Sequence, residues 1–122
     1  MSTIEKISEL IHDEINKLNY ANYFILADDT VLYPYIVYNP QLLDIIYKFS
    51  GEIDIISVDF FIYSTTNPYT ILNDLDAIFN RVHYNISGYN FMCCYKKSVS
   101  KGERSDDCFT LIATYVFEIE IL

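Results

Sequence analysis

The residues that most often carry enzyme chemistry are few in this sequence, and the two histidines are poorly spaced for it. His12 and His83 are the only histidines, and neither belongs to an H-x-x-x-H or H-E-x-x-H pair of the kind that binds zinc. His12 falls on the polar side of a predicted first helix. His83 falls at the predicted end of a second helix, where the helix dipole favours a positive imidazolium. Both histidines are therefore interpreted as structural.

The three cysteines also make a poor metal or disulfide framework. Cys93 and Cys94 are adjacent, and neighbouring residues on a strand point to opposite faces, so they cannot bind one metal as a C-x-x-C pair does. An odd cysteine count argues against a disulfide scaffold and indicates a reducing compartment. Any of the three could still act as a nucleophile, Cys108 included, so a small cysteine enzyme is a third function class.

Carboxylates are plentiful, but their positions have ordinary structural explanations. Asp28-Asp29 and Asp106-Asp107 fall in predicted turns, where aspartate is common, and Glu118 and Glu120 share one face of a predicted strand. The sequence contains no calcium-binding loop, P-loop or G-x-G-x-x-G motif, and it has only three glycines. We therefore expect no catalytic residues, no cofactor and no metal site.

Charge is distributed unevenly along the chain. The net charge is −9, which argues against a surface that grips nucleic acid as a whole. The segment from Lys96 to Arg104 holds four basic residues and one acidic residue, a net charge of +3, while the other four basic and 16 acidic residues give −12. We predict a partner-binding site at the four basic residues, Lys96, Lys97, Lys101 and Arg104.

Length and composition indicate one folded domain that spans residues 1–122. The chain has 122 residues, of which 52% are hydrophobic, enough for a core without disulfides or metal. No run of about 18 apolar residues occurs, so no membrane span is predicted. The first ten residues carry charges from position 5 onward, and no signal peptide is expected.

Two amphipathic helices are predicted from the 3.6-residue spacing of apolar side chains. Ser2 and Glu5 resemble a capping box at the start of the first helix, and Asn19 is a plausible end. In the second helix Asn67 caps the N-terminus, Pro68 takes the first helical position, and the end lies near His83. The apolar stripes are Ile4, Ile7, Ile11, Ile15 and Leu18 in the first helix, and Ile71, Leu75, Ile78, Phe79 and Val82 in the second.

The first half of the chain also contains two strand-like runs, Tyr20–Leu26 and Val31–Tyr38. Asp28-Asp29-Thr30 lies between them and predicts a hairpin. Pro34 indicates an edge strand or a bulge in the second run, and Asn39-Pro40 is expected to end it. Residues 41–49 fit either a short helix or a packed loop.

Three further strands are predicted at Ile53–Ser64, Tyr89–Lys97 and Phe109–Leu122. In the first of them, Ile55-Ile56 breaks the strict alternation of a strand, which indicates a bulge. A projecting polar loop, Ser98–Asp107, joins the other two. The predicted fold is α+β, with a mainly antiparallel sheet of about five strands and two helices packed on one face.

Aromatic side chains give the only candidate for an oligomer interface. The chain contains twelve tyrosines, and tyrosine is enriched in interfaces because it combines a large apolar ring with a polar tip. Phe61 and Tyr63 lie on the face of the third strand opposite its core stripe, and we predict that they form this interface. The alternative is a composition bias, since isoleucine and asparagine are abundant as well.

The order of elements and several segments resemble the tail terminator, or tail completion, proteins of long-tailed bacteriophages. The resemblance covers most of the chain and includes no catalytic signature. It is carried by the opening helix, Tyr33-Pro34-Tyr35-Ile36-Val37-Tyr38, Ile53–Ser64 with the helix Tyr69–Val82, and the closing segment Thr114–Ile121.

This resemblance implies a structural virion protein, assembled in the host cytoplasm, that forms a homo-oligomeric ring, usually a hexamer, at the head-tail junction. DNA would pass through the ring without sequence-specific binding, and other neck or tail proteins would be the partners. An acidic lumen would repel the phosphates of the passing DNA.

A small acidic inhibitor or immunity-type protein is the second function class that the sequence allows. Such a protein binds a basic partner and can mimic DNA. Its signature would be carboxylates spaced like phosphates on one continuous surface, and the protein would be a stable monomer.

Overall fold

The computed structural model describes residues 2–27, 31–49, 51–86, 88–102 and 108–122, and for residues 86 and 91–94 it describes the backbone alone. The first helix is confirmed, and its N-cap is Ser2, whose hydroxyl accepts a hydrogen bond from the backbone N–H of Glu5. Asn19, with φ 64°, directly follows the C-cap residue Leu18. The elements are α1 (Thr3–Lys17), β1 (Ala21–Phe24), β2 (Tyr35–Lys48), β3 (Gly51–Ser64), α2 (Tyr69–Phe79), β4 (Val82–Ile86), β5 (Tyr89–Lys101) and β6 (Phe109–Ile121).

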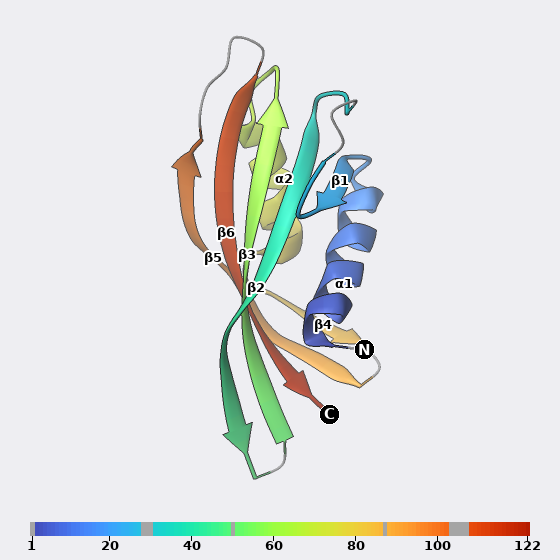
Figure 1. Cartoon of the computed structure of the whole chain (residues 1–122), viewed down its shortest axis with the longest axis vertical. Coiled ribbons are helices and arrows are strands. Elements are labelled where there is room, and N and C mark those ends of the chain that lie inside the picture. The colour runs from blue at the N-terminus through green and yellow to red at the C-terminus, as the bar shows by residue number, and fades with distance from the viewer. Residues whose placement is uncertain (1, 28–30, 50, 87, 103–107) are drawn as a thin grey trace.

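The strands form one sheet of six strands in the order β1-β2-β3-β6-β5-β4 (Figure 1). The α+β class is confirmed, but the sheet is larger than the five strands expected, and it is mixed. β1 runs parallel to β2, whereas every other neighbouring pair is antiparallel.

The hairpin predicted between the first two strands is wrong. Ala21 lies beside Tyr35 and Phe24 beside Tyr38, so both strands run in the same direction. The chain leaves β1 at Ile25, which has φ 67° and donates its N–H to the carbonyl of Tyr38 over 2.9 Å. Strand propensity does not encode direction, which explains the error. The expected turn, residues 28–30, lies outside the described residues.

β2 does not end at Asn39-Pro40 as predicted. Residues 41–48, expected to form a short helix or a loop, belong to this strand. β2 continues to Lys48 and pairs with β3 over this whole length. β1 reaches only as far as Tyr38. Beyond that point β2 is an edge strand, where a proline is tolerated because an outward-facing N–H has no ladder partner to lose. The β2–β3 hairpin therefore forms a long arm, whose tip lies at the bottom of Figure 1, beyond both helices.

β3 is confirmed and is regular, because its register with β6 is continuous from Glu52 to Ser64. The irregularity expected at Ile55-Ile56 lies in the partner strand. Leu42 pairs with Ile56 and Asp44 with Ile55, so Leu43 is the extra residue of a bulge in β2.

α2 is shorter than predicted, and a strand follows it. The N-cap residue is Pro68, one position later than predicted, although the side chain of Asn67 still accepts a hydrogen bond from the N–H of Tyr69 over 3.0 Å. The helix ends at Phe79, because Asn80 is extended and Arg81 has φ 59°. His83 therefore lies exposed on β4, and its interpretation as a helix-end residue is wrong.

The predicted loop between the last two strands begins later than expected. β5 extends through Lys101, so residues 98–101 are strand, and Gly102 donates its N–H to the carbonyl of Thr110 over 2.9 Å. Residues 103–107 of this loop lie outside the described residues.

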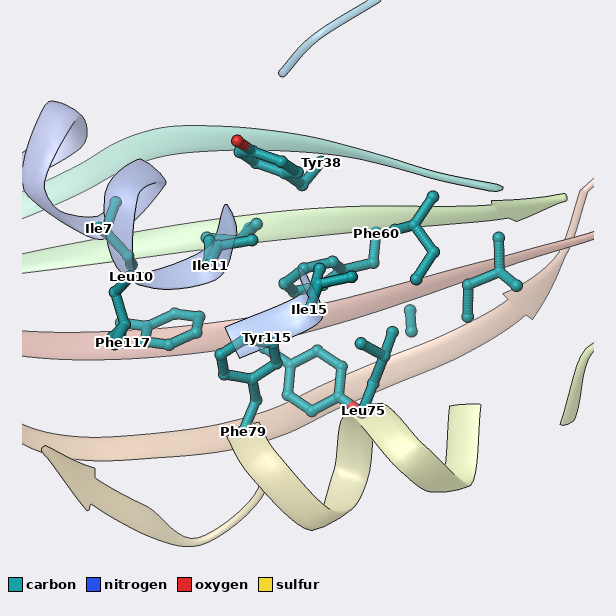
Figure 2. Packing of buried hydrophobic residues seen from close by; sticks show 14 of the residues in the cluster. Ile7, Leu10, Ile11, Ile15, Tyr38, Phe60, Leu75, Phe79, Tyr115 and Phe117 are labelled. Carbon is teal, nitrogen blue, oxygen red and sulfur yellow. The ribbon is translucent and has the colours of Figure 1, made fainter. Parts of the chain in front are cut away.

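One hydrophobic core joins both helices to one face of the sheet (Figure 2). Phe60 of β3 stacks on Phe79 of α2 with 5.4 Å between ring centroids, and it meets Tyr115 of β6 edge-on at 5.5 Å. Ile7, Ile11 and Ile15 of α1 are completely buried in the same core. The shared burial fixes both helices on one face of the sheet, as predicted.

Neither described helix can serve as a membrane span. α1 has 15 residues and α2 has 11, and no helix in the described part of the chain combines the necessary length and apolar character.

Candidate assembly surfaces

The two faces of the sheet differ in what covers them. Along β3, Ile56, Val58, Phe60 and Ile62 are completely buried on the face that carries the helices. Between them, Ser57, Asp59, Phe61 and Tyr63 are all half-buried on the other, helix-free face. This helix-free face is the part of the sheet that a partner could cover.

Phe61 and Tyr63, the predicted interface residues, belong to a larger group on the helix-free face. Tyr35 stacks on Tyr63 with 4.7 Å between ring centroids and on Tyr33 at 5.6 Å, and Tyr23 meets Tyr35 edge-on at 6.2 Å. We call Tyr23, Tyr33, Tyr35, Phe61 and Tyr63 the aromatic patch. Tyr23, Tyr33 and Tyr35 were not predicted as interface residues, although the alternation of Tyr33, Tyr35 and Val37 is a signal that could have found two of them.

A groove of about 230 Å³ runs beside the aromatic patch. Its walls are partly polar and partly apolar, and they include Ile25 and Leu26, which are 56% and 80% exposed. Exposed leucine and isoleucine side chains next to half-buried aromatic rings are typical of a surface that a protein partner desolvates. The residues that line the groove are Ile25, Leu26, Ala27, Tyr35, Val37, Phe61 and Tyr63.

The phenols of Tyr35 and Tyr63 remain neutral at physiological pH, because both pKa values are raised above the ordinary value. Burial is the largest cause that raises the pKa of Tyr35 above its ordinary value, and the neighbouring Tyr63 raises it further. Burial likewise raises the pKa of Tyr63. A neutral phenol costs less to desolvate than a charged group and still offers a hydrogen-bond donor, so the patch suits a buried contact.

The structure does not gather the four predicted basic residues into one described site. Lys96 forms an ion pair with Asp76 of α2, with 2.7 Å between Nζ and Oδ2, and the same carboxylate accepts a hydrogen bond from the hydroxyl of the buried Tyr115. Lys96 is thus paired within its own domain. Lys97 is exposed at a register shift of β5, Lys101 is exposed near the end of β5, and Arg104 lies outside the described residues.

Lys101 lies at the rim of a hollow of about 500 Å³. The start of α2 and the facing ends of β5 and β6 form its mainly apolar walls. Asn67, Tyr69 and Phe109 are exposed there. The hollow offers one cation and no described cluster of acid, base and nucleophile, so it does not by itself define a catalytic site.

The histidines and the remaining cysteine have structural surroundings. His12 is exposed, and its two ring nitrogens lie 2.8 Å from the side-chain oxygen of Asn22 and 3.0 Å from the side-chain nitrogen of Asn16. Cys108 is buried, with its sulfur 4.0 Å from the hydroxyl of Thr110. The side chains of Cys93 and Cys94 lie outside the description. Among described residues, no group of three or more histidine, cysteine, aspartate or glutamate side chains could hold a metal.

No protein-family model matches this sequence, and no curated protein matches it.

Proposed function

We propose that this chain is a structural virion assembly protein of the tail-terminator type, without catalytic activity, that forms a ring at the head-tail junction around the DNA passage. The aromatic patch is the observation that carries the proposal. Tyr33, Tyr35 and Tyr63 stack on one another on the helix-free face, next to a groove that is lined in part by the exposed Ile25 and Leu26.

The composition of the patch favours a protein contact over a small-molecule site. Tyrosine side chains contribute large contact areas at a low cost in conformational entropy. Stacking between Tyr33, Tyr35 and Tyr63 orders these rings before any partner binds. In a closed ring the patch would contact a different surface of the neighbouring subunit, because ring interfaces are heterologous.

The acidic character of the chain is consistent with a DNA passage. A net charge of −9 repels phosphates at short range, so passing DNA would not adhere to an acidic lumen. The exposed Lys97 and Lys101 would then contact an acidic neck or tail protein, or the DNA itself.

Two single substitutions test the patch. Phe61→Asp and Tyr63→Asp place a charge in the proposed contact, so we expect smaller particles by sedimentation velocity and loss of rings in electron micrographs. Ser57→Asp is the matched control, because Ser57 is half-buried on the same face of β3 and lies outside the patch. Circular dichroism would establish that all variants fold. Unchanged sedimentation of both patch variants would refute this interface.

One observation favours the acidic inhibitor instead. Glu5, Glu9 and Asp13 recur every fourth residue on α1 and are all exposed, which places successive carboxylates about 6 Å apart along the helix. The row is short, and Lys6 lies 3.5 Å from Glu9. A protein that stays monomeric and binds a basic partner through this row would support the inhibitor and exclude the ring.

A further inference from the structure

The arm formed by β2 and β3 has an edge that no described strand covers. β1 pairs with β2 only from Tyr35 to Tyr38, so the outer side of β2 from residue 39 to residue 48 has no neighbouring strand in the described structure. The arm extends away from both helices at the bottom of Figure 1. A long uncovered edge with apolar side chains invites pairing with another strand.

Several side chains near the tip of this edge are apolar and exposed to a degree that the monomer does not explain. Tyr47 is 76% exposed, Ile46 is 43% exposed, and Phe49 at the tip is fully exposed. Natural edge strands usually limit association with prolines, bulges or several charges. Here Pro40 and the bulge at Leu43 protect only the part of the edge that is nearer to β1. Residues 44–48 pair regularly with β3 and have neither a proline nor a bulge.

The order of side chains along residues 44–48 is self-complementary. The register with β3 places Asp44, Ile46 and Lys48 on the helix-free face, and Ile45 and Tyr47 on the opposite face. An opposite pair of charges therefore flanks Ile46 symmetrically on one face. In an antiparallel pair of identical strands centred on Ile46, each charge meets its opposite.

We propose that two copies of this chain associate through this edge, antiparallel, with Ile46 at the two-fold axis. Asp44 of each copy then lies opposite the partner's Lys48, and Ile45 lies opposite the partner's Tyr47. The main-chain hydrogen bonds continue the sheet from one copy into the other, and the helices of both copies stay on the same side of it.

Other registers with the same symmetry are less favourable. Centring the pair on Asp44 or on Lys48 places like charges directly opposite each other, which is destabilising. Centring it on Ile45 places Asp44 opposite Ile46 and Lys48 opposite Leu42, and centring it on Tyr47 places Lys48 opposite Ile46 and Asp44 opposite Ser50, so neither charge meets its opposite. A shift of one residue relative to the partner strand would turn the side chains of one copy to the wrong face.

This contact is separate from the aromatic patch and does not depend on the proposed function. An isologous two-fold contact closes after two copies and cannot by itself build a ring. If rings form through the aromatic patch, the arms would join two rings or pair subunits before assembly. The dimer should therefore be measured in the Tyr63→Asp background, where failure of the ring proposal and failure of the edge proposal can be distinguished.

Charge reversal with rescue is the decisive experiment. Asp44→Lys and Lys48→Asp each place like charges opposite each other at both ends of the ladder, so each should raise the dimer dissociation constant about tenfold. The double variant D44K/K48D exchanges the charges and should return the dissociation constant to within about threefold of the parent value. Sedimentation equilibrium over a wide protein concentration range gives all four dissociation constants.

Matched variants make the outcome interpretable. Glu5→Lys, a reversal at an exposed site on α1, should leave dimerisation unchanged. Ile46→Lys should abolish it without unfolding the chain, because the Ile46 side chain is exposed in the monomer.

Three results would overturn the proposal. The first is a parent protein that remains monomeric at about 0.5 mM, which sets the dissociation constant near 1 mM or above. The second is a double variant no better than the single variants. The third is a dissociation constant that rises for one single reversal and falls for the other. That result would indicate that β2 pairs with a charged edge such as β5 and not with a second β2.

Discussion

The two faces of β3 show how one strand serves two different purposes. On the helix-covered face, Phe60 is completely buried and its ring contacts Phe79 and Tyr115. On the helix-free face, the next residue, Phe61, is half-buried beside a groove. Both side chains are the same size and lie in the same strand. The difference in cover means that Phe60 contributes to folding, whereas Phe61 is available to a partner.

The polar residues show the same contrast. On the covered side, Asp76 accepts hydrogen bonds from the buried Tyr115 and from Lys96. On the helix-free side, Thr114 donates to Asp59 over 2.6 Å, and both residues are half-exposed. Loss of the Asp76 carboxylate therefore leaves the buried Tyr115 hydroxyl without this partner. Loss of the Asp59 carboxylate costs less, because water can bond to the Thr114 hydroxyl in its place.

The largest expected effect is a difference in the free energy of unfolding between variants of Phe60 and Phe61. Phe60→Ala should lower the free energy of unfolding by about 3–5 kcal/mol, because it removes a completely buried ring and leaves a cavity. Phe61→Ala should lower it by about 1 kcal/mol or less. Urea denaturation of both variants measures the difference. Equal losses would mean that the helix-free face is as much a part of the core as the covered face.

A smaller effect is expected at the two aspartates. Asp76→Ala should cost about 1–3 kcal/mol, since the buried Tyr115 hydroxyl loses its carboxylate partner. Asp59→Ala should cost about 0.5 kcal/mol, because the Thr114 hydroxyl can bond to water. Thermal unfolding at fixed pH compares them, and a larger loss for Asp59→Ala would contradict the contrast between the faces.

Alkaline pH provides a third, smaller test on the covered side. Burial, together with the hydrogen bond from its hydroxyl to Asp74, raises the pKa of Tyr20 from 10.0 to about 12. A raised pKa in the folded state means that the stabilisation is complete below pH 10 and is lost as the pH rises towards 12.

Tyr20→Phe is the variant for this test. It should be less stable than the parent at pH 8, and the difference should shrink between pH 10 and 12. Denaturant titrations at several pH values measure this convergence. A difference independent of pH over that range would show that ionisation of Tyr20 is not linked to folding.

The smallest effect on stability is expected at the exposed lysines of β5. Reversal of Lys97 and Lys101, together with Arg104, to glutamate should change the free energy of unfolding by about 0.5 kcal/mol or less. If these residues bind an acidic partner, association should slow at low salt and the difference should disappear at high salt, because exposed charges are screened.

Lys96→Glu is the internal comparison for this set. It should lower stability measurably, because Lys96 pairs with Asp76 in the folded domain. Equal assembly rates for the parent and the triple variant at both salt concentrations would leave Lys97, Lys101 and Arg104 without a role in binding.

The candidate surfaces were only partly predictable. Phe61 and Tyr63 could be placed opposite the core stripe because alternation along a strand fixes the face of each residue. Their stacking neighbour Tyr35 could not be placed, because it comes from β2, and the pairing of β2 with β3 is a long-range contact. The ion pair of Lys96 with Asp76 also joins distant elements, so the sequence could not show it. The predicted basic site is therefore divided, because Lys96 is paired within the domain.

The sequence by itself determined the elements whose signals are local. The spacing of isoleucines gave α1, the alternation of apolar residues gave β3 and β6, and Asn67 marked the start of α2. Only the tertiary structure decided the direction of β1, the continuation of β2 through Pro40, and the strand β4 after the early end of α2. These features depend on which strand lies alongside, and a proline is acceptable at Pro40 only because β1 has already ended there.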